Sequence, residues 1–200
     1  IVVGNSIRSI ATSGVYLDGT NADANVIRSN VFDGRNFEPW AIFIRDADQT
    51  LITNNRIVRH TSAAVEMSNT ASSNRITGNR IYSNGLYAVR WRGGPADGNT
   101  ILRNFFYRNG PVALLAGSGT SNRVINNDMY GQTAAGARVE SAATGTRLVN
   151  NIIQSNGSRG ISNAGVGTRL ENNDIFGHTQ NVANTVAFAI SNGNIYSNAR

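Results

Sequence analysis

Residues 74–85 read Asn-Arg-Ile-Thr-Gly-Asn-Arg-Ile-Tyr-Ser-Asn-Gly, and they contain the pattern that decides the fold. An apolar residue, Ile76, is followed three positions later by Asn79 and two positions after that by a second apolar residue, Ile81. The same pattern recurs along the chain with a spacing of 22–25 residues, and a ninth copy is expected at Ile195 and Asn198. The recurring asparagines are Asn5, Asn30, Asn55, Asn79, Asn104, Asn127, Asn151 and Asn173. A period of this length predicts a solenoid.

The residues between the asparagines favour strands over helices. Apolar and polar residues alternate around each copy, and Gly, Asn, Ser and Asp stand at the expected corners. No run at helical spacing is long enough for a helical repeat, and the Leu-x-x-Leu-x-Leu frame of leucine-rich repeats is missing. The sequence therefore predicts an all-β fold, a single-stranded parallel β-helix of about eight coils stacked about 4.8 Å apart.

The recurring asparagine has a structural explanation. A parallel stack places the same side chain above itself in every coil, and an amide can both donate and accept hydrogen bonds along the stack. Asparagine also tolerates the left-handed conformation that a sharp corner requires. We therefore interpret the eight asparagines as an internal structural ladder and not as catalytic groups.

A second strand is expected in each coil, with two inward-facing residues. The predicted inward pairs are Val15/Leu17, Ile42/Ile44, Val65/Met67, Val89/Trp91, Ala113/Leu115, Ala137/Val139 and Phe188/Ile190. Glycines surround Ile161, which predicts a loose or bulged rung there. Residues 177–185 are expected to form a longer loop.

Segments such as residues 74–85 resemble the right-handed parallel β-helix repeats of the pectate-lyase-like superfamily. Within that superfamily, the Asn-Asn and Asn-Gly corners are similar to those of alginate C5-epimerases, alginate lyases and the β-helix proteins of periplasmic copper-enzyme maturation. The resemblance covers the whole chain and implies a right-handed β-helix with a carbohydrate-related, extracellular or periplasmic role. One scaffold of this kind serves many chemistries, so the repeat alone does not define a function.

Composition sets further limits. Residues 1–200 are expected to form a single β-helix domain, either a segment of a longer solenoid or a subunit that stacks head to tail. The absence of Cys excludes disulfides and thiolate metal sites. No stretch of about 18 apolar residues is present, so membrane insertion is not expected. No nucleic-acid motif accompanies the formal charge of +6, and nucleic acid is not an expected partner.

All the basic residues are Arg, whose planar guanidinium suits carboxylates and phosphates. In four coils an arginine stands four residues before the ladder asparagine: Arg75, Arg123, Arg147 and Arg169. The last three are expected on consecutive coils, where like charges repel unless an anion neutralises them. Two explanations stay open, because an acidic polysaccharide or the neighbouring Asp128, Glu171 and Asp174 could supply the negative charge.

A second outward row stands three residues after the ladder asparagine. It contains Tyr82, Tyr107 and Tyr130 on consecutive coils, with Phe176 two coils further on. Sugar rings stack on exposed aromatic faces, whereas stacked aromatic residues also stabilise sheets without any ligand. Exposure of the ring faces distinguishes the two explanations.

The outward side of the second strands combines opposite charges. Glu66 is followed one coil later by Arg90 and Arg92, and two coils beyond by Arg138, with Arg45 and Glu140 nearby. In a lyase or epimerase, Arg90 and Arg92 would neutralise a uronate carboxylate and Glu66 would be their carboxylate partner. The alternative is an ordinary cross-strand ion pair between Glu66 and Arg90.

The sequence differs from alginate epimerases in one respect. The Asp-Pro-His motif that supplies the catalytic groups of those enzymes is absent. His60 and His178 each stand five residues after a ladder asparagine, and we interpret both as polar corner residues and not as a base or a metal ligand. The corresponding residues of other coils are Asn84, Asn109, Gln132 and Asn156.

Metal signals are weak. Asp18 to Asp23 and the pair Asp46 and Asp48 are typical of Asx turns, and neither matches an EF-hand or a calcium-binding repeat. No cofactor and no metal are predicted, although oxygen ligands for calcium are present.

These observations predict an extracellular or periplasmic β-helix scaffold that engages acidic polysaccharide and has no intact catalytic motif. Two alternatives stay open: a filament subunit whose open coil ends stack on copies of itself, and a polysaccharide lyase or uronate C5-epimerase. No catalytic residue is assigned. The candidate polysaccharide-binding residues are Tyr82, Tyr107, Tyr130, Glu66, Arg90, Arg92, Arg123, Arg147 and Arg169.

Overall fold

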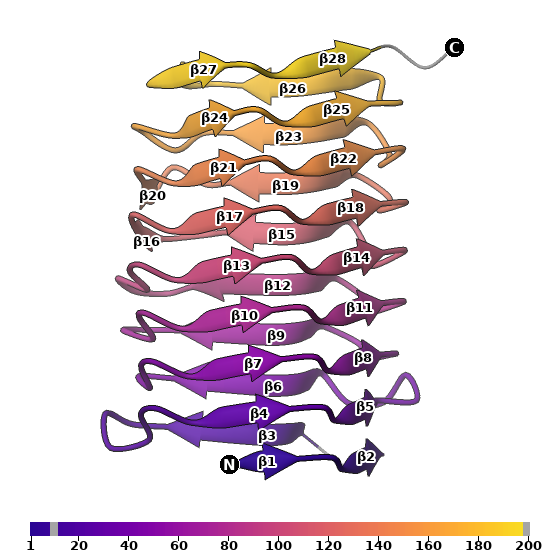
Figure 1. Cartoon of the computed structure of the whole chain (residues 1–200), viewed down its shortest axis with the longest axis vertical. Helices are drawn as coiled ribbons and strands as arrows, with labels where there is room; N and C mark the ends of the chain where they lie inside the picture. Colours follow the sequence, from indigo (N-terminus) through magenta and orange to yellow (C-terminus); the bar gives the residue numbers. More distant parts are fainter. Residues whose placement is uncertain (9–11, 198–200) are drawn as a thin grey trace.

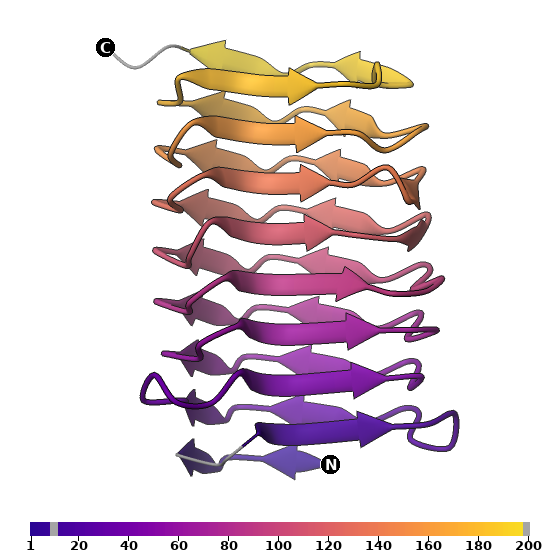
Figure 2. The same ribbon diagram turned by 180° about the vertical axis from the view of Figure 1, so that it is seen from behind.

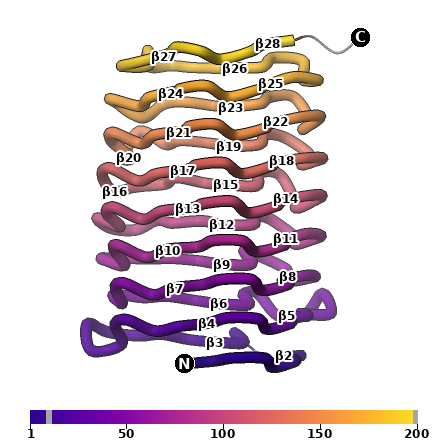
Figure 3. The backbone as a smooth tube through the Cα atoms, in the orientation of Figure 1, coloured from indigo at the N-terminus to yellow at the C-terminus, as the bar shows by residue number. Residues whose placement is uncertain are grey.

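The chain folds into a continuous stack of short parallel strands (Figure 1). The computed structural model describes residues 1–8 and 12–197. Within these residues the strands form three long parallel sheets, which we call sheets A, B and C, and one short additional pair. Each coil passes through sheets A, B and C in turn, and the next coil lies directly on it (Figures 1 and 3). The predicted all-β parallel β-helix is confirmed.

Each of the first eight coils contributes one strand to each long sheet, and the last contributes strands to sheets A and B within the described residues. Sheet A contains β1 (Val2–Val3), β4 (Val26–Arg28), β7 (Leu51–Thr53), β10 (Arg75–Thr77), β13 (Thr100–Leu102), β17 (Arg123–Ile125), β21 (Arg147–Val149), β24 (Arg169–Glu171) and β27 (Ile190–Asn192). Sheet B contains β2 (Ser6–Arg8), β5 (Val31–Asp33), β8 (Arg56–Val58), β11 (Arg80–Tyr82), β14 (Phe105–Tyr107), β18 (Asp128–Tyr130), β22 (Ile152–Gln154), β25 (Asp174–Phe176) and β28 (Ile195–Ser197). Sheet C contains β3 (Ser13–Asp18), β6 (Trp40–Arg45), β9 (Ala63–Ser68), β12 (Tyr87–Arg92), β15 (Val112–Ala116), β19 (Ala135–Val139), β23 (Arg159–Asn163) and β26 (Gln180–Asn184). The additional pair is β16 (Gly119–Thr120) and β20 (Ala143–Thr144).

The ladder asparagine marks the bend between sheets A and B. The left-handed residue at this bend is the one before the ladder asparagine, as at Asn54, Arg103 and Asn126, where φ is 54°, 53° and 54°. We had expected the left-handed conformation at the ladder asparagine itself. The Asn-Asn pairs of the sequence therefore combine two separate tasks, because the first residue turns the backbone and the second forms the ladder.

Hydrogen bonds along the stack confirm the predicted ladder. The backbone N and Nδ2 of Asn79 both donate to Oδ1 of Asn104, at 2.9 and 3.0 Å. Asn104 in turn donates from Nδ2 to the carbonyl oxygen of Ile76 at 2.9 Å and to Oδ1 of Asn127 at 3.1 Å. These amides are 1–2% exposed, so each one satisfies buried backbone groups as well as its neighbour.

The ninth ladder member is Asn194, and the prediction of Ile195 and Asn198 for this copy was wrong. The backbone N and Nδ2 of Asn173 donate to Oδ1 of Asn194 at 2.9 and 3.0 Å. Strand β27 pairs with β24 in a register that places Ser191 beside Leu170, so a polar residue replaces the apolar anchor that defined the pattern. Asn198 lies outside the described residues.

Two further amide ladders run through the other corners. Between sheets B and C, the backbone N of Asn84 donates to Oδ1 of Asn109, at 3.3 Å, and the backbone N of Asn109 donates to Oε1 of Gln132, at 2.9 Å. Before sheet A, the backbone N of Asn74 donates to Oδ1 of Asn99 at 2.9 Å, and the backbone N of Asn99 donates to Oδ1 of Asn122 at 2.8 Å. In the central coils, all three corners are therefore held by buried side-chain amides.

Apolar side chains from the three sheets fill the interior, and most predicted inward pairs are confirmed. In β15, however, the inward residues are Leu114 and Ala116, because they align with Val89 and Trp91. The prediction of Ala113/Leu115 was shifted by one position, since nearly every residue of this strand is apolar and alternation gives no signal there.

The last coils differ from the prediction. Residues 180–184 form β26, which pairs with β23, so the expected long loop at 177–185 and the inward pair Phe188/Ile190 were wrong. The rung at Ile161 is regular, because β23 pairs in register with strands on both sides. Its glycine is needed for close packing, since a Cβ on Gly160 would lie 2.4 Å from Cγ2 of Ile175.

Candidate carbohydrate-binding face on sheet C

The outward face of sheet C forms a continuous surface seen in front in Figure 2. Period-two alternation turns Ile42 and Ile44 into the core and Phe43 outward. The parallel register then places Phe43, Glu66 and Arg90 side by side on three consecutive coils. An aromatic ring, a carboxylate and a guanidinium therefore lie in one line on this face.

Glu66 is buried and has three donors. Its Oε2 accepts hydrogen bonds from Nε1 of Trp40 at 2.6 Å and from the guanidinium of Arg90, and its Oε1 accepts from Nε of Arg92 at 2.9 Å. The Glu66 side chain is 0% exposed, whereas that of Arg92 is 54% exposed. The ion pair between Glu66 and Arg90 is present. Because both carboxylate oxygens are occupied and shielded from solvent, Glu66 is suited to fixing the two arginines and not to accepting a substrate proton.

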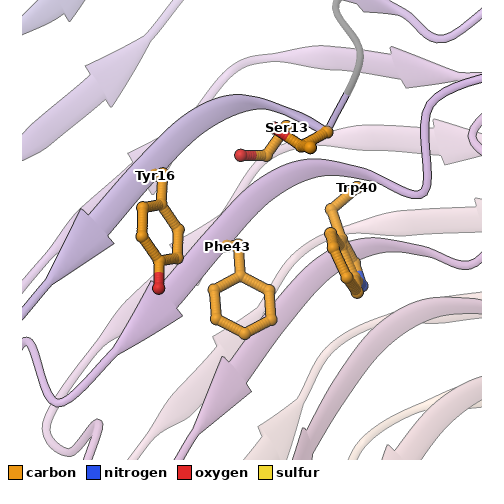
Figure 4. A pocket seen from close by; sticks show the side chains of 5 residues that line it. Ser13, Tyr16, Trp40 and Phe43 are labelled. Atoms are coloured by element: carbon orange, nitrogen blue, oxygen red, sulfur yellow. The ribbon is translucent and has the colours of Figure 1, made fainter.

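A pocket of about 360 Å³ lies beside this ion cluster and is lined by Thr12, Ser13, Tyr16, Trp40 and Phe43 (Figure 4). The rings of Trp40 and Phe43 are 4.9 Å apart, and those of Tyr16 and Phe43 are 5.3 Å apart. Trp40 forms one wall of the pocket and also donates to Glu66, so the aromatic surface continues into the arginine pair. Flat rings open to solvent are the groups that bind sugar rings.

Two cations lie over aromatic rings of the same face. The guanidinium carbon of Arg45 is 5.7 Å from the ring centre of Tyr16, and that of Arg90 is 5.0 Å from the ring centre of Tyr87. Arg45 also forms an exposed ion pair with Asp18, which lowers the pKa of that carboxyl through their hydrogen bond. Cationic and aromatic groups thus alternate across the face.

The aromatic part of this face was not predicted from the sequence. Phe43 and Tyr16 stand at the same outward position as Glu66, one and two coils before it respectively, so extending the predicted row towards the N-terminus would have found both. Trp40 gave no such signal, because it stands at the first position of its strand and its side chain reaches Glu66 in the next coil.

The rest of the predicted charge row is exposed and continues on later coils. Leu115 lies between Arg90 and Arg138 in the observed register of sheet C. Nε of Arg138 lies 2.7 Å from Oε1 of Glu140, and both side chains are at least one-third exposed. This pair resembles the Glu66 cluster in chemistry but not in burial.

The tyrosine row lies on sheet B, away from the sheet C face. Tyr82, Tyr107 and Tyr130 are neighbours on consecutive coils, as predicted. The rings of Tyr82 and Tyr107 are stacked 4.5 Å apart with an angle of 10°, and Nε of Arg56 donates to the hydroxyl of Tyr82 at 2.7 Å. These two ring faces cover each other, which is the arrangement of stacked aromatic residues that stabilise a parallel sheet.

The arginine row lies on sheet A. Arg123, Arg147 and Arg169 are Cα partners on consecutive coils, as predicted. The structure therefore brings Glu66, Arg90 and Arg92 together and leaves the tyrosine row and the arginine row as two separate surfaces.

The two histidines lie at buried corners between sheets B and C. The backbone N of His60 donates to Oδ1 of Asn84 at 3.0 Å, which places His60 in the corner ladder. The ring nitrogens of His178 lie 2.8 Å from the carbonyl oxygen of Asn156 and 3.1 Å from that of Ile153. The polar-corner interpretation explains both positions.

His60 makes stability depend on pH. Burial lowers the pKa of His60 to about 4, against the attraction of Asp33, and Oε2 of Glu38 lies 3.6 Å from Nδ1 of the ring. The unfolded chain takes up a proton near the ordinary pKa of about 6.5 while the folded chain does not. The contribution of His60 to the free energy of unfolding is therefore constant above about pH 6.5. It falls by up to about 3 kcal/mol as the pH decreases to 4.

The variant His60→Asn tests this dependence, because Asn84 and Asn109 hold the same position in the next coils. Urea unfolding measured between about pH 7 and 4 should give a shallower loss of stability for this variant than for the parent chain. Equal slopes for the two proteins would show that His60 does not control the acid sensitivity.

The aspartates of the two predicted Asx turns bond to the adjacent coil. Oδ1 of Asp48 accepts from the backbone N of Ser72 at 2.7 Å, and Oδ1 of Asp23 accepts from the backbone N of Asp48 at 2.7 Å. Among residues 1–8 and 12–197, no group of three or more His, Cys, Asp or Glu side chains is placed to hold a metal ion. The same residues contain no helix that could span a membrane.

A family model described as the right-handed β-helix region matches residues 40–199, and the chain belongs to this family. No curated protein sequence matched the chain.

Solved structures share the fold at low sequence identity. A double mutant of the periplasmic alginate epimerase AlgG is 15% identical with a TM-score of 0.87, over 99% of this chain and 50% of that one. An alginate lyase from Paenibacillus sp. str. FPU-7 is 16% identical with a TM-score of 0.75, over 97% of this chain and 75% of that one. The A-module of a mannuronan C-5 epimerase from Azotobacter vinelandii is 16% identical with a TM-score of 0.71, over 88% of this chain and 56% of that one. The chain thus spans about half of the AlgG structure, and at these identities the likeness shows the fold alone.

Proposed function

We propose that this β-helix is an extracytoplasmic scaffold that binds acidic polysaccharide along the outward face of sheet C. The observation that supports the proposal is the continuity between the aromatic pocket and the arginine pair, because Trp40 lines the first and bonds to the carboxylate that fixes the second. Structural neighbours named for action on alginate, an acidic polysaccharide, support the same ligand class.

The chemistry of the face suits a uronate chain. The rings of Tyr16, Trp40 and Phe43 offer apolar surface for sugar rings, and the largely exposed guanidinium of Arg92 can pair with a carboxylate. Glu66 holds Arg92 through Nε, which leaves the terminal nitrogens of Arg92 for a ligand. The arginine is therefore held in place before binding, which lowers the entropy that binding must remove.

Trp40 provides a direct test of this site. The chain has two tryptophans, and Trp91 is 0% exposed, so a ligand that changes the intrinsic fluorescence should act through Trp40. We expect an oligouronate to change the fluorescence of the parent chain. Isothermal titration should show that Trp40→Ala and Phe43→Ala each weaken binding about tenfold.

Tyr130→Ala is the matched control, since it removes an exposed aromatic ring from sheet B. Its affinity for the oligouronate should equal that of the parent chain. Equal binding by the parent chain, Trp40→Ala and Phe43→Ala would refute the proposed site. The filament and lyase or epimerase alternatives remain predictions of the sequence.

A further inference from the structure

A second cationic surface lies on sheet A, away from the proposed sheet C site. It consists of Arg123, Arg147 and Arg169, which we call the arginine column. The inward neighbours of these residues are fully buried apolar side chains, so the arginines face outward. Sheet A lies in front in Figure 1 and sheet C lies behind it, which places the column and Glu66 on opposite faces of the molecule.

The column borders a groove of about 320 Å³. The opposite wall is formed by Ser121, Gly145 and Gly167, which stand two residues before the three arginines and have φ of 57°, 62° and 70°. Because two of these residues have no side chain, the groove stays open along the stack. Its volume is in the range of small-ligand pockets.

The positive charge of the column is mostly uncompensated. Arg147 pairs with Glu171, with its terminal nitrogen 3.2 and 3.3 Å from the two carboxylate oxygens. Within the described residues, neither Arg123 nor Arg169 makes an ion pair or a side-chain hydrogen bond. Asp128 and Asp174, the other candidates for compensation, lie in sheet B, on strands that do not pair with sheet A.

One buried atom of the column lacks a hydrogen-bond acceptor. Nε of Arg147 is buried and has no hydrogen-bond partner, although a buried N–H group is normally satisfied. Neighbouring strands are about 4.8 Å apart, so the three positive charges lie close together. Within the described residues, the carboxylate paired with them is that of Glu171, which contacts Arg147. An anion in the groove would relieve the repulsion among the three guanidinium groups.

We propose that the arginine column is a second polysaccharide site, which binds the carboxylates of a uronate chain running along the stack. A uronate chain running along the stack would pass all three arginines, so its carboxylates can pair with guanidinium groups on consecutive coils. Uronate is favoured over nucleic acid because the residues lining the groove include no aromatic ring on which a base could stack.

Two sites on opposite faces give the protein a further activity. Since a straight chain cannot occupy both faces at once, one molecule would hold two polysaccharide chains and cross-link them. This consequence rests on the proposed sheet C site, whereas binding at the arginine column does not.

The test removes the two unpaired arginines with Arg123→Gln/Arg169→Gln. The control, Arg28→Gln/Arg75→Gln, removes the same charge from other coils of sheet A, where Thr100 separates Arg75 from the column. Both pairs are made in the Trp40→Ala background, and binding of an oligouronate is measured by isothermal titration. We expect the column variant to bind at least tenfold more weakly than the control variant.

The outcomes separate the two proposals. Residual binding in the Trp40→Ala chain that is lost only in the column variant supports the arginine column, whether or not the sheet C site exists. Equal binding by the column and control variants overturns it. Binding of inorganic polyphosphate at the column without binding of the oligouronate also overturns it, because the column would then be a phosphate site.

Discussion

Glu66→Gln is expected to destabilise the folded chain by about 3 kcal/mol, because it leaves a buried guanidinium without its counter-charge. The side chain of Arg90 is only 14% exposed, and Glu66 is its carboxylate partner. The amide of glutamine keeps the shape of the site but offers one acceptor where three donors converge. Urea unfolding measures the loss.

Glu140→Gln is the matched control for this substitution. Glu140 also pairs with an arginine on the outward face of sheet C, but its side chain is 36% exposed and that of Arg138 is 53% exposed. Water can replace the lost contact there, so the cost should stay below about 1 kcal/mol. Similar costs for the two variants would contradict the buried ion cluster described for Glu66.

Asn104→Ala is expected to cost about 3 kcal/mol as well, because it removes the centre of the Asn ladder. The carbonyl oxygen of Ile76 loses its side-chain donor, and both the backbone N and the amide of Asn79 lose their acceptor. All these groups lie in the interior, where water cannot replace the missing amide. Thermal and urea unfolding should both show the change.

Asn5→Ala provides the comparison, since Asn5 holds the same ladder position in the exposed first coil. Its side chain donates to Oδ1 of Asn30 and to the exposed carbonyl oxygen of Val3. Solvent can satisfy these partners, so the effect should be only a few tenths of a kcal/mol. A loss for Asn104→Ala no greater than that for Asn5→Ala would refute the structural role of the ladder.

The fold could be predicted because its main constraint repeats in the sequence. An amide at one corner of every coil must bond to the coils on either side, so the chain shows the same residue at nearly the same period. The prediction failed where the repeat changes. Asn194 follows a shorter step with Ser191 at the apolar position, and β15 is apolar at every position and therefore shows no alternation.

The candidate site could be predicted only in part. Counting positions along the repeat was enough to predict that Glu66 lies beside Arg90, because both occupy the same position in their strands. The third donor to Glu66 is Trp40, whose ring reaches it from the preceding coil, and no spacing rule shows such a contact. The stacking of Tyr82 on Tyr107 is similarly a matter of side-chain orientation, which the row of tyrosines in the sequence does not reveal.

We propose that the sheet C face binds a polysaccharide through the carboxylates as well as the sugar rings of the ligand. The most direct test compares an oligouronate with its neutral methyl ester by isothermal titration, using Arg123→Gln/Arg169→Gln to leave only the sheet C site. We predict that the free acid binds at least tenfold more tightly and that added salt weakens its binding. No binding of either oligosaccharide, or equal binding of both, would contradict the claim.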